Sequence, residues 1–290
     1  MVDAGSWRIS WRGRCAGKGI RLACLFSGVG HVRLGVLPRT KEWKEVVGLI
    51  AAGANVSQIA QATIAAAEKA FSFVMKDVGY TEAVWLMTQM AIAAKKPDIL
   101  LHLAAAAIHL PADPSLTDVT TAITEALDRR VEGNGKRSDL GMLANRAIVG
   151  AVNDVLAPKL HSLFSSDPDT MRAALADLGK PREFGEFSRH FFARLANEGL
   201  QYFLSKVVNT QLGEGMRFAT MNQAAEFNAA LQIHTREASL IVEQFSSEWF
   251  SKHRFHEGGD ISRKSSDGFA GYALKKMRDE LKMGASSDAR

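Results

Sequence analysis

Over most of the chain after Thr40, apolar residues recur three and four positions apart, and this spacing restricts the possible folds more than any other feature. It is the period of an amphipathic α-helix, which turns one side toward a core every 3.6 residues. No segment alternates apolar and polar residues over β-branched side chains, as a half-buried strand would. The sequence therefore predicts an all-α fold, a multi-helix bundle.

The helical pattern is interrupted at 132–137, where glycine, asparagine and charged residues predict a turn or linker. We expect a basic arm at 1–38, a helical lobe at 39–132, a second lobe at 137–252, and a polar loop with a docking helix at 253–290. The break separates either two lobes or only two neighbouring helices, and the sequence leaves both open.

The clearest periodicity lies between Ala224 and Glu248, where apolar positions alternate by three and four without a slip. It predicts one long helix near 221–252. Such a seam forms either a coiled coil with a partner or second copy, or the longest helix of an intramolecular bundle. On the first interpretation, the partner-binding residues are Phe227, Leu231, His234, Ile241 and Phe245.

The most apolar window, Ile99–Leu110, lies between Pro97 and Pro111. A membrane-spanning helix needs about 20 such residues, so this window predicts a fully buried core helix, and we expect no transmembrane segment. The same interpretation makes His102 and His109 hydrogen-bonded core residues, too far apart on one helix to share a metal ion.

The positive charge is concentrated at the N-terminus. Residues 1–40 carry seven basic side chains against a single acid, a net charge of +6, while the whole chain is +5. Trp and Arg alternate there, a composition that can stack on bases and neutralise phosphates, although a solvated tail has the same composition. The residues expected to contact nucleic acid are Arg8, Arg12, Arg14, Lys18 and Arg21.

The N-terminus does not have the pattern of a signal peptide, because the apolar run at 22–26 is shorter than the roughly 7–15 residues required. The chain has two cysteines, both in the arm, where they predict neither a disulfide framework nor a zinc site. We therefore expect a reducing, cytoplasmic location.

Phosphate-binding and nucleophile motifs are absent from the sequence, and we predict no cofactor. One weak metal signal remains in His253, His256, Glu257 and Asp260, whose side chains are of the types that bind zinc or other divalent ions. The alternative is a helix C-terminus at which basic residues complement the dipole.

A second weak signal is the group formed by Arg182, Arg189 and His190, the only catalytic candidates. The all-α HEPN ribonucleases carry an R-x4–6-H signature. Arg182 and His190 have seven residues between them, so the signature is not met and no resemblance is established.

The sequence favours a non-enzymatic helical interaction or scaffold subunit of an intracellular assembly, with another protein or a second copy as partner. The alternatives are a nucleic-acid-binding protein that uses residues 1–40, and a helical metal-dependent or HEPN-like hydrolase. A motif search misses sites built from distant residues, so the absence of motifs is weak support for a non-enzyme.

Overall fold

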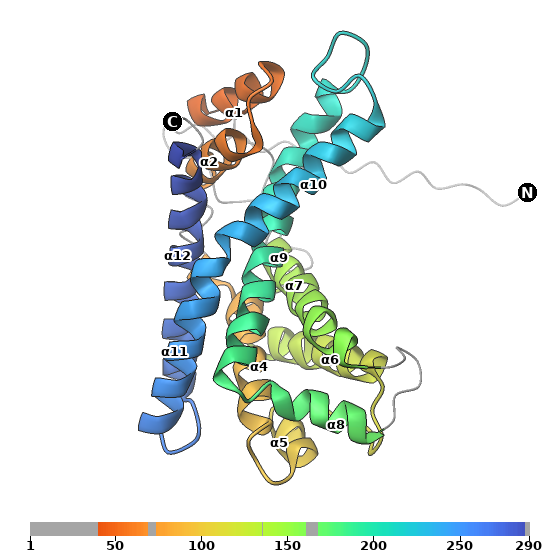
Figure 1. Ribbon diagram of the computed structural model, residues 1–290, viewed down its shortest axis with the longest axis vertical. Helices are drawn as coiled ribbons and strands as arrows, with labels where there is room; N and C mark the ends of the chain where they lie inside the picture. The colour runs from red at the N-terminus through yellow and green to blue at the C-terminus, as the bar shows by residue number, and fades with distance from the viewer. Residues whose placement is uncertain (1–39, 69–73, 135, 161–167, 288–290) are drawn as a thin grey trace, which may run out of the picture. The chain divides into compact units, whose positions relative to one another are not determined.

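The structure is a computed structural model that describes residues 40–68, 74–134, 136–160 and 168–287. The predicted all-α fold is confirmed: these residues form helices joined by turns and loops, with an isolated bridge between Leu212 and Phe218. The helices (Figure 1) are α1 (Lys41–Ala51), α2 (Val56–Ala66), α4 (Val78–Ala93), α5 (Ile99–Ala105), α6 (Leu116–Asn134), α7 (Asp139–Leu156), α8 (Pro168–Asp177), α9 (Pro181–Val208), α10 (Met221–Ala238), α11 (Leu240–His256) and α12 (Arg263–Ser287).

Short polar side chains begin many of these helices. At each such position the side-chain oxygen accepts a hydrogen bond from the backbone N–H three residues on, which satisfies a donor that the helix leaves free. At α2 the arrangement is a full capping box, because Gln58 also accepts from the backbone of Asn55. The capping residues of this type are Thr40, Asn55, Asp77, Asp98, Ser138 and Thr220.

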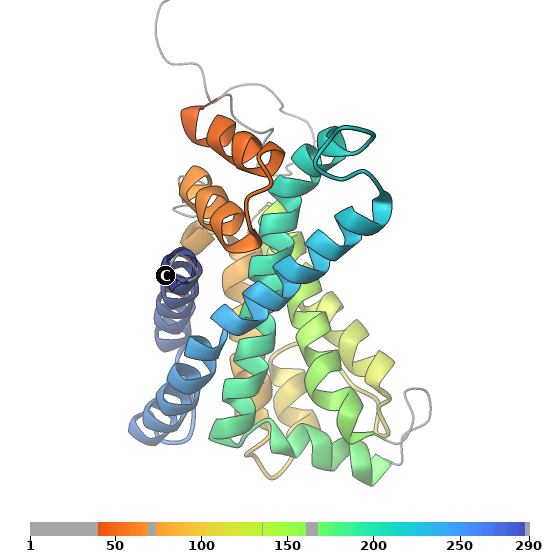
Figure 2. The same cartoon turned by 45° about the horizontal axis from the view of Figure 1, so that its top comes forward.

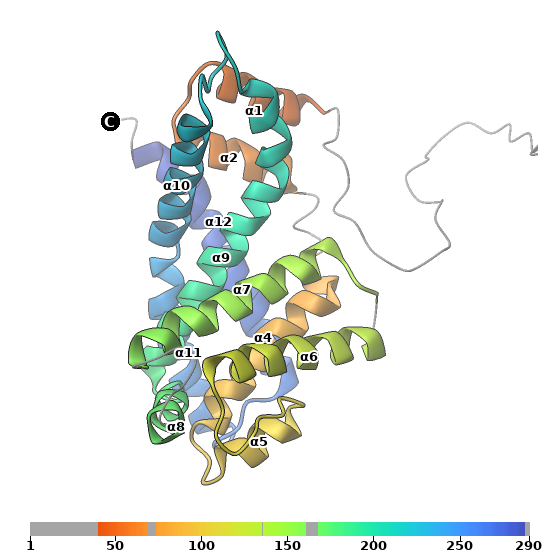
Figure 3. The ribbon, with the colours of Figure 1, turned by 90° about the vertical axis from the view of Figure 1, so that its right-hand side faces the viewer.

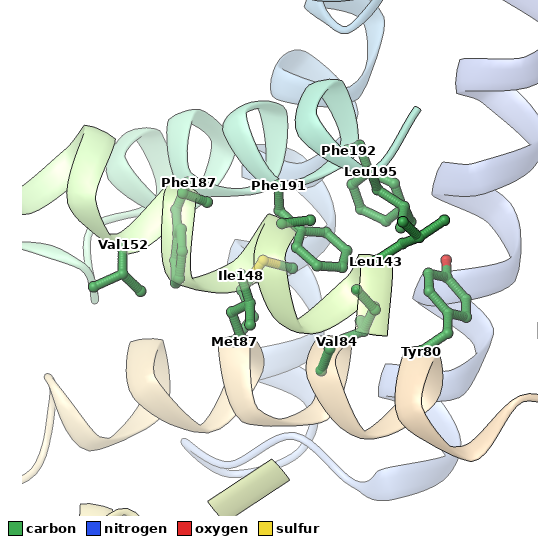
Figure 4. Close-up of a cluster of buried hydrophobic side chains, with 14 of the residues drawn as sticks. Tyr80, Val84, Met87, Leu143, Ile148, Val152, Phe187, Phe191, Phe192 and Leu195 are labelled. Carbon is green, nitrogen blue, oxygen red and sulfur yellow. The ribbon is translucent and has the colours of Figure 1, made fainter. Parts of the chain in front are cut away.

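Helix α9 lies at the centre of the packing. It contacts α7 on one side and the successive helices α10 and α11 on another (Figures 2 and 3). Figure 4 shows α7 between α4 and α9, with side chains from all three helices interleaved. The buried phenylalanines that α9 contributes are Phe184, Phe187, Phe191, Phe192 and Phe203.

Two contacts bring helix backbones unusually close. A methyl group at Gly185 of α9 would lie 2.1 Å from Ser247 Oγ and 2.6 Å from the Glu243 carbonyl oxygen of α11. A methyl group at Gly79 of α4 would lie 2.5 Å from the Cα of Gly141 in α7. Glycine is therefore required at these crossings by space alone.

The first turns of α4 and α7 share one polar group. Asp77 accepts a hydrogen bond from the backbone N–H of Tyr80 at 2.9 Å, and also from the hydroxyl of Ser138. Ser138 in turn accepts from the backbone N–H of Gly141 at 2.8 Å. The two N-terminal caps are thus a single hydrogen-bonded unit.

The predicted single helix near 221–252 is wrong in one respect: it is divided at Ser239 into α10 and α11, and α11 continues to His256. The Ser239 hydroxyl is fully buried and donates to the Arg236 carbonyl oxygen at 2.7 Å, one turn after Thr235 donates to that of Gln232. Hydroxyls that donate to a carbonyl of the preceding turn bend helices and compete with the backbone hydrogen bonds of the helix.

The predicted buried helix at 99–110 is also wrong. Helix α5 ends at Ala105, Leu101 is 67% exposed, and Ala107 has a positive φ of 68°. Arg129 and Arg130 of α6 donate to the carbonyl oxygens of Ala107 and Ala106, at 2.8 and 3.0 Å. These bonds satisfy carbonyls that a longer helix would have used. His102 and His109 were expected in the core, but His102 is half-buried and His109 is exposed.

Helices on both sides of the 132–137 break pack into one buried apolar cluster. A buried charge adds to this connection. Glu82 of α4 lies between Arg130 of α6, at 3.3 Å, and Arg263 of α12, at 2.7 Å. A buried carboxylate needs such partners, because an unpaired one would be strongly disfavoured.

The Gly185 crossing gives a stability prediction. We expect Gly185→Ala to lower the free energy of unfolding by about 3 kcal/mol, since the added methyl overpacks against backbone as well as side chain. Gly199→Ala is the matched control in the same helix, because nothing lies within 4 Å of its Cβ position. It should stabilise by about 0.5–1 kcal/mol. Urea unfolding measures both, and equal effects would contradict the close crossing.

Candidate functional site

The seam residues predicted to bind a partner lie inside the chain's own bundle. Phe227 and Leu231 are buried, and the Phe227 ring lies 5.5 Å from that of Phe218. Phe245 packs on Tyr272 of α12, with ring centroids 4.5 Å apart. Ile241 and His234, the remaining two, are half-buried. A partner that binds this element would have to use its opposite face.

That opposite face exposes apolar side chains. Met221, Ile233 and Leu240 are 72, 58 and 53% exposed, and the exposed alanines Ala225 and Ala229 continue the line along α10. The spacing of four keeps 221–233 on one side of α10, and Leu240, the first residue of α11, follows seven residues later. We call these five residues the outer face of α10.

The residues predicted as a weak metal cluster do not converge. His253 Nδ1 lies 3.1 Å from Glu257 Oε1, whereas Asp260 pairs with Lys96 at 2.7 Å. His256 is exposed and contacts the ring of Phe255. Within the described ranges, no three His, Cys, Asp or Glu side chains are placed to hold one ion.

Glu257 instead organises the start of α12. It accepts the backbone N–H of Ser262 at 2.6 Å. The pKa of Glu257 is lowered to about 2 by hydrogen bonds, of which the largest contribution comes from the Ser265 hydroxyl and smaller ones from Ser262 and His253. The signal that resembled a metal site is therefore a carboxylate that caps a turn.

The three catalytic candidates have separate surroundings. Arg182 is exposed, and Arg189 pairs with Glu243 of α11 at 2.8 Å. His190 points elsewhere: its Nδ1 lies 3.1 Å from Asp154 Oδ2 of α7. The structure does not bring the two arginines and the histidine together, but it places His190 in a different polar group.

That group is built by two helices with matched spacing. Arg194 lies one turn after His190 on α9 and donates two hydrogen bonds of 2.7 Å to the Asp154 carboxylate. Gly150, one turn before Asp154 on α7, leaves the space for the guanidinium, since a methyl there would lie 2.7 Å from Arg194 Nη1. Asp154 thus receives a bidentate arginine and a histidine simultaneously.

The electrostatics of this group favour an ionised carboxylate. Burial alone raises the pKa of the Asp154 carboxyl, but hydrogen bonds from His190 and Arg194 and their charges outweigh it. The pKa of Asp154 consequently lies well below its usual range. The pair also fixes the histidine ring, because a carboxylate at Nδ1 orients the imidazole.

These side chains line a polar hollow with a volume of about 230 Å³ between α7, α9 and α10. Arg236 and Gln232 enter it from α10, and Asn197 and Glu198 from α9. A histidine oriented by an aspartate is the base of many hydrolases. The one hydroxyl in the lining, that of Thr235, is buried and donates to a carbonyl oxygen, so a nucleophile is lacking within the lining that the structure describes.

The basic residues proposed for nucleic acid, Arg8 to Arg21, lie outside the described residues. Within the described part, the stretch 139–159 has the length and composition of a membrane span, with a mean hydropathy of 1.2. It includes α7, a core helix of this bundle, and core helices of globular proteins meet the same criterion.

In comparisons with known proteins, no family model, curated protein or solved structure matches this chain.

The Asp154 group gives a pH prediction. Its pKa is lower in the folded chain than the ordinary 3.8, so its stabilisation is present above that value and is lost as the pH falls toward the folded pKa. We expect Asp154→Asn to lower the unfolding free energy by about 2 kcal/mol at pH 7. The difference from wild type should shrink below pH 4, measured by urea unfolding across pH. A difference independent of pH would contradict the ionised group.

Proposed function

We propose that this chain is a non-enzymatic interaction subunit that assembles with a second copy of itself through the outer face of α10. The observation that carries the proposal is the exposed apolar side chains of Met221 and Ile233 on α10, whose inner face is already buried, and of Leu240 at the start of α11. Contiguous exposed apolar residues on a well-packed helix are characteristic of a contact surface.

The outer face supports a two-fold contact. Two large side chains, Ile233 and Leu240, follow two small ones, Ala225 and Ala229, and a third large one, Met221, precedes them. In an antiparallel pair centred between 229 and 233, each isoleucine would meet the partner's alanine. Small residues let helices approach closely, and a two-fold interface uses the same surface twice.

The proposal predicts a dimer that depends on two residues. Sedimentation equilibrium of the full chain should show dimers at about 100 μM and below. Ile233→Glu combined with Leu240→Glu should raise the dissociation constant at least about 100-fold, because each change places a charge in an apolar contact.

Gln223→Glu is the control: it adds a negative charge to an exposed position of α10 that lies off the outer face, because it is two residues from both Met221 and Ala225. It should leave the dimer intact. A wild-type chain that stays monomeric at about 100 μM would reject the proposal, as would a double variant that dimerises like wild type. Circular dichroism shows whether each variant keeps its helices.

Nucleic-acid binding is the second candidate, favoured by the +6 charge of residues 1–40. The described part adds one observation: Phe255, at the end of α11, is 83% exposed and lies beside Lys252 and Arg254. Neither cation has an ion pair among the described residues. Aromatic rings that stack on bases, with cations for phosphates, are typical of single-strand binding.

For this candidate, fluorescence anisotropy with a single-stranded oligonucleotide should show affinity that falls steeply with salt. Deletion of residues 1–36 should reduce it at least about tenfold, because most of the cationic charge is lost. Phe255→Ala in the full chain should weaken binding by a smaller factor, about 1–3 kcal/mol for one lost stack. Unchanged affinity after the deletion would exclude the arm.

A further inference from the structure

We infer that the polar hollow between α7, α9 and α10 binds a small organic anion, a carboxylate or a phosphate ester, with Arg236 as the residue that pairs with its charge. The residues that carry this inference differ from the five of the outer face, although Gln232 and Arg236 lie beside Ala229 and Ile233 on the same helix. The inference rests on how the hollow is built, on which of its charges are already paired, and on its size.

The walls of the hollow are preorganised. Asp154 holds Arg194 by two bonds of 2.7 Å, and His190 by one contact of 3.1 Å, so these three side chains are fixed before any ligand arrives. Gly150 provides the space that this arrangement requires. Binding sites with side chains fixed in advance lose less conformational entropy when a ligand binds.

The pairing of charges determines the kind of ligand. Asp154 is neutralised by Arg194, and Glu198 pairs with Arg146 at 3.3 Å. Arg236 also lines the hollow and has no ion pair among the described residues. The charge left over in the hollow is therefore positive, and a guanidinium matches carboxylate and phosphate geometry.

Neutral hydrogen-bond donors surround the unpaired charge. The amide groups of Asn197 and Gln232 line the same hollow, and either can donate to an oxyanion or to a hydroxyl on the ligand. His190 Nε2 lies 3.9 Å from Glu186, beyond hydrogen-bond distance, so this edge of the ring is not held by that carboxylate. The ligand class is thus an anion that also carries polar groups.

The size of the hollow favours a small molecule over a polymer. A volume of about 230 Å³ is slightly below the range of roughly 300–1,000 Å³ typical of small-molecule pockets. Three helices line the hollow, and a space of this volume holds a single small molecule.

The test uses the full chain and two probes, succinate and inorganic phosphate, at constant ionic strength. The side-chain amide signals of Asn197 and Gln232 in NMR spectra should shift in a saturable way with at least one probe, at a Kd of about 1 mM. Arg236→Gln should raise that Kd about tenfold to 100-fold, because the charged hydrogen bonds are lost. Succinate binding alone indicates a carboxylate ligand, and phosphate binding alone indicates a phosphate ester.

Arg217→Gln is the matched control: it removes one positive charge from an exposed loop position away from the lining. It should bind like wild type, and equal weakening by the two variants would show a nonspecific charge effect and overturn the inference. The absence of saturable shifts with either probe up to about 100 mM would also overturn it. Met221→Glu, an outer-face position 15 residues before Arg236 on the same helix, should leave both titrations unchanged, which separates this site from the dimer contact.

Discussion

Helix α9 meets α11 at Gly185, where the position of a Cβ atom is already taken by the hydroxyl of Ser247 and the carbonyl of Glu243. This approach brings the aromatic side of α9 against Phe250 and Trp249, whose rings lie 4.4 and 6.0 Å from Phe184. The remaining packing follows from it, because α7, α10 and α12 all contact α9 as well.

A second glycine acts on the other side of α9. Gly150 of α7 leaves room for a guanidinium instead of a neighbouring backbone, and the result is a polar hollow instead of a tight apolar crossing. The same residue type thus produces the closest packing in one place and the candidate ligand site in another. What differs is the side chain opposite: Ser247 in the first case and Arg194 in the second.

Helix positions could be predicted from sequence because periodicity and caps are local. Most of the seam at 224–248 packs against the core, which is one of the two alternatives that the sequence left open. Its division at Ser239 could not be predicted, since a serine in an apolar stripe looks the same whether or not its hydroxyl bonds back. The burial expected for 99–110 failed for a different reason. Apolar composition does not show which other helices contact a segment. The arginines that bind the carbonyl oxygens after α5 belong to α6, which is not adjacent to them in the local pattern.

The polar hollow could not be predicted because its residues lie on three helices far apart in the sequence. The local signals were pairs four residues apart, Gly150 with Asp154 and His190 with Arg194, and such pairs occur in most helices. The metal site predicted at 253–260 was wrong for the opposite reason. Its residues are close in sequence but do not converge in space, because Asp260 pairs with Lys96.

The shared cap of Asp77 and Ser138 has a consequence for how the chain acquires its structure. Each helix N-terminus carries a partial positive charge of roughly half a unit, and two such ends meet where Gly79 faces Gly141. The Asp77 carboxylate caps α4 directly and accepts from the Ser138 hydroxyl that caps α7, so the two ends share one negative charge. Two segments 61 residues apart in the chain therefore order together, and their first turns should open to solvent as one cooperative unit.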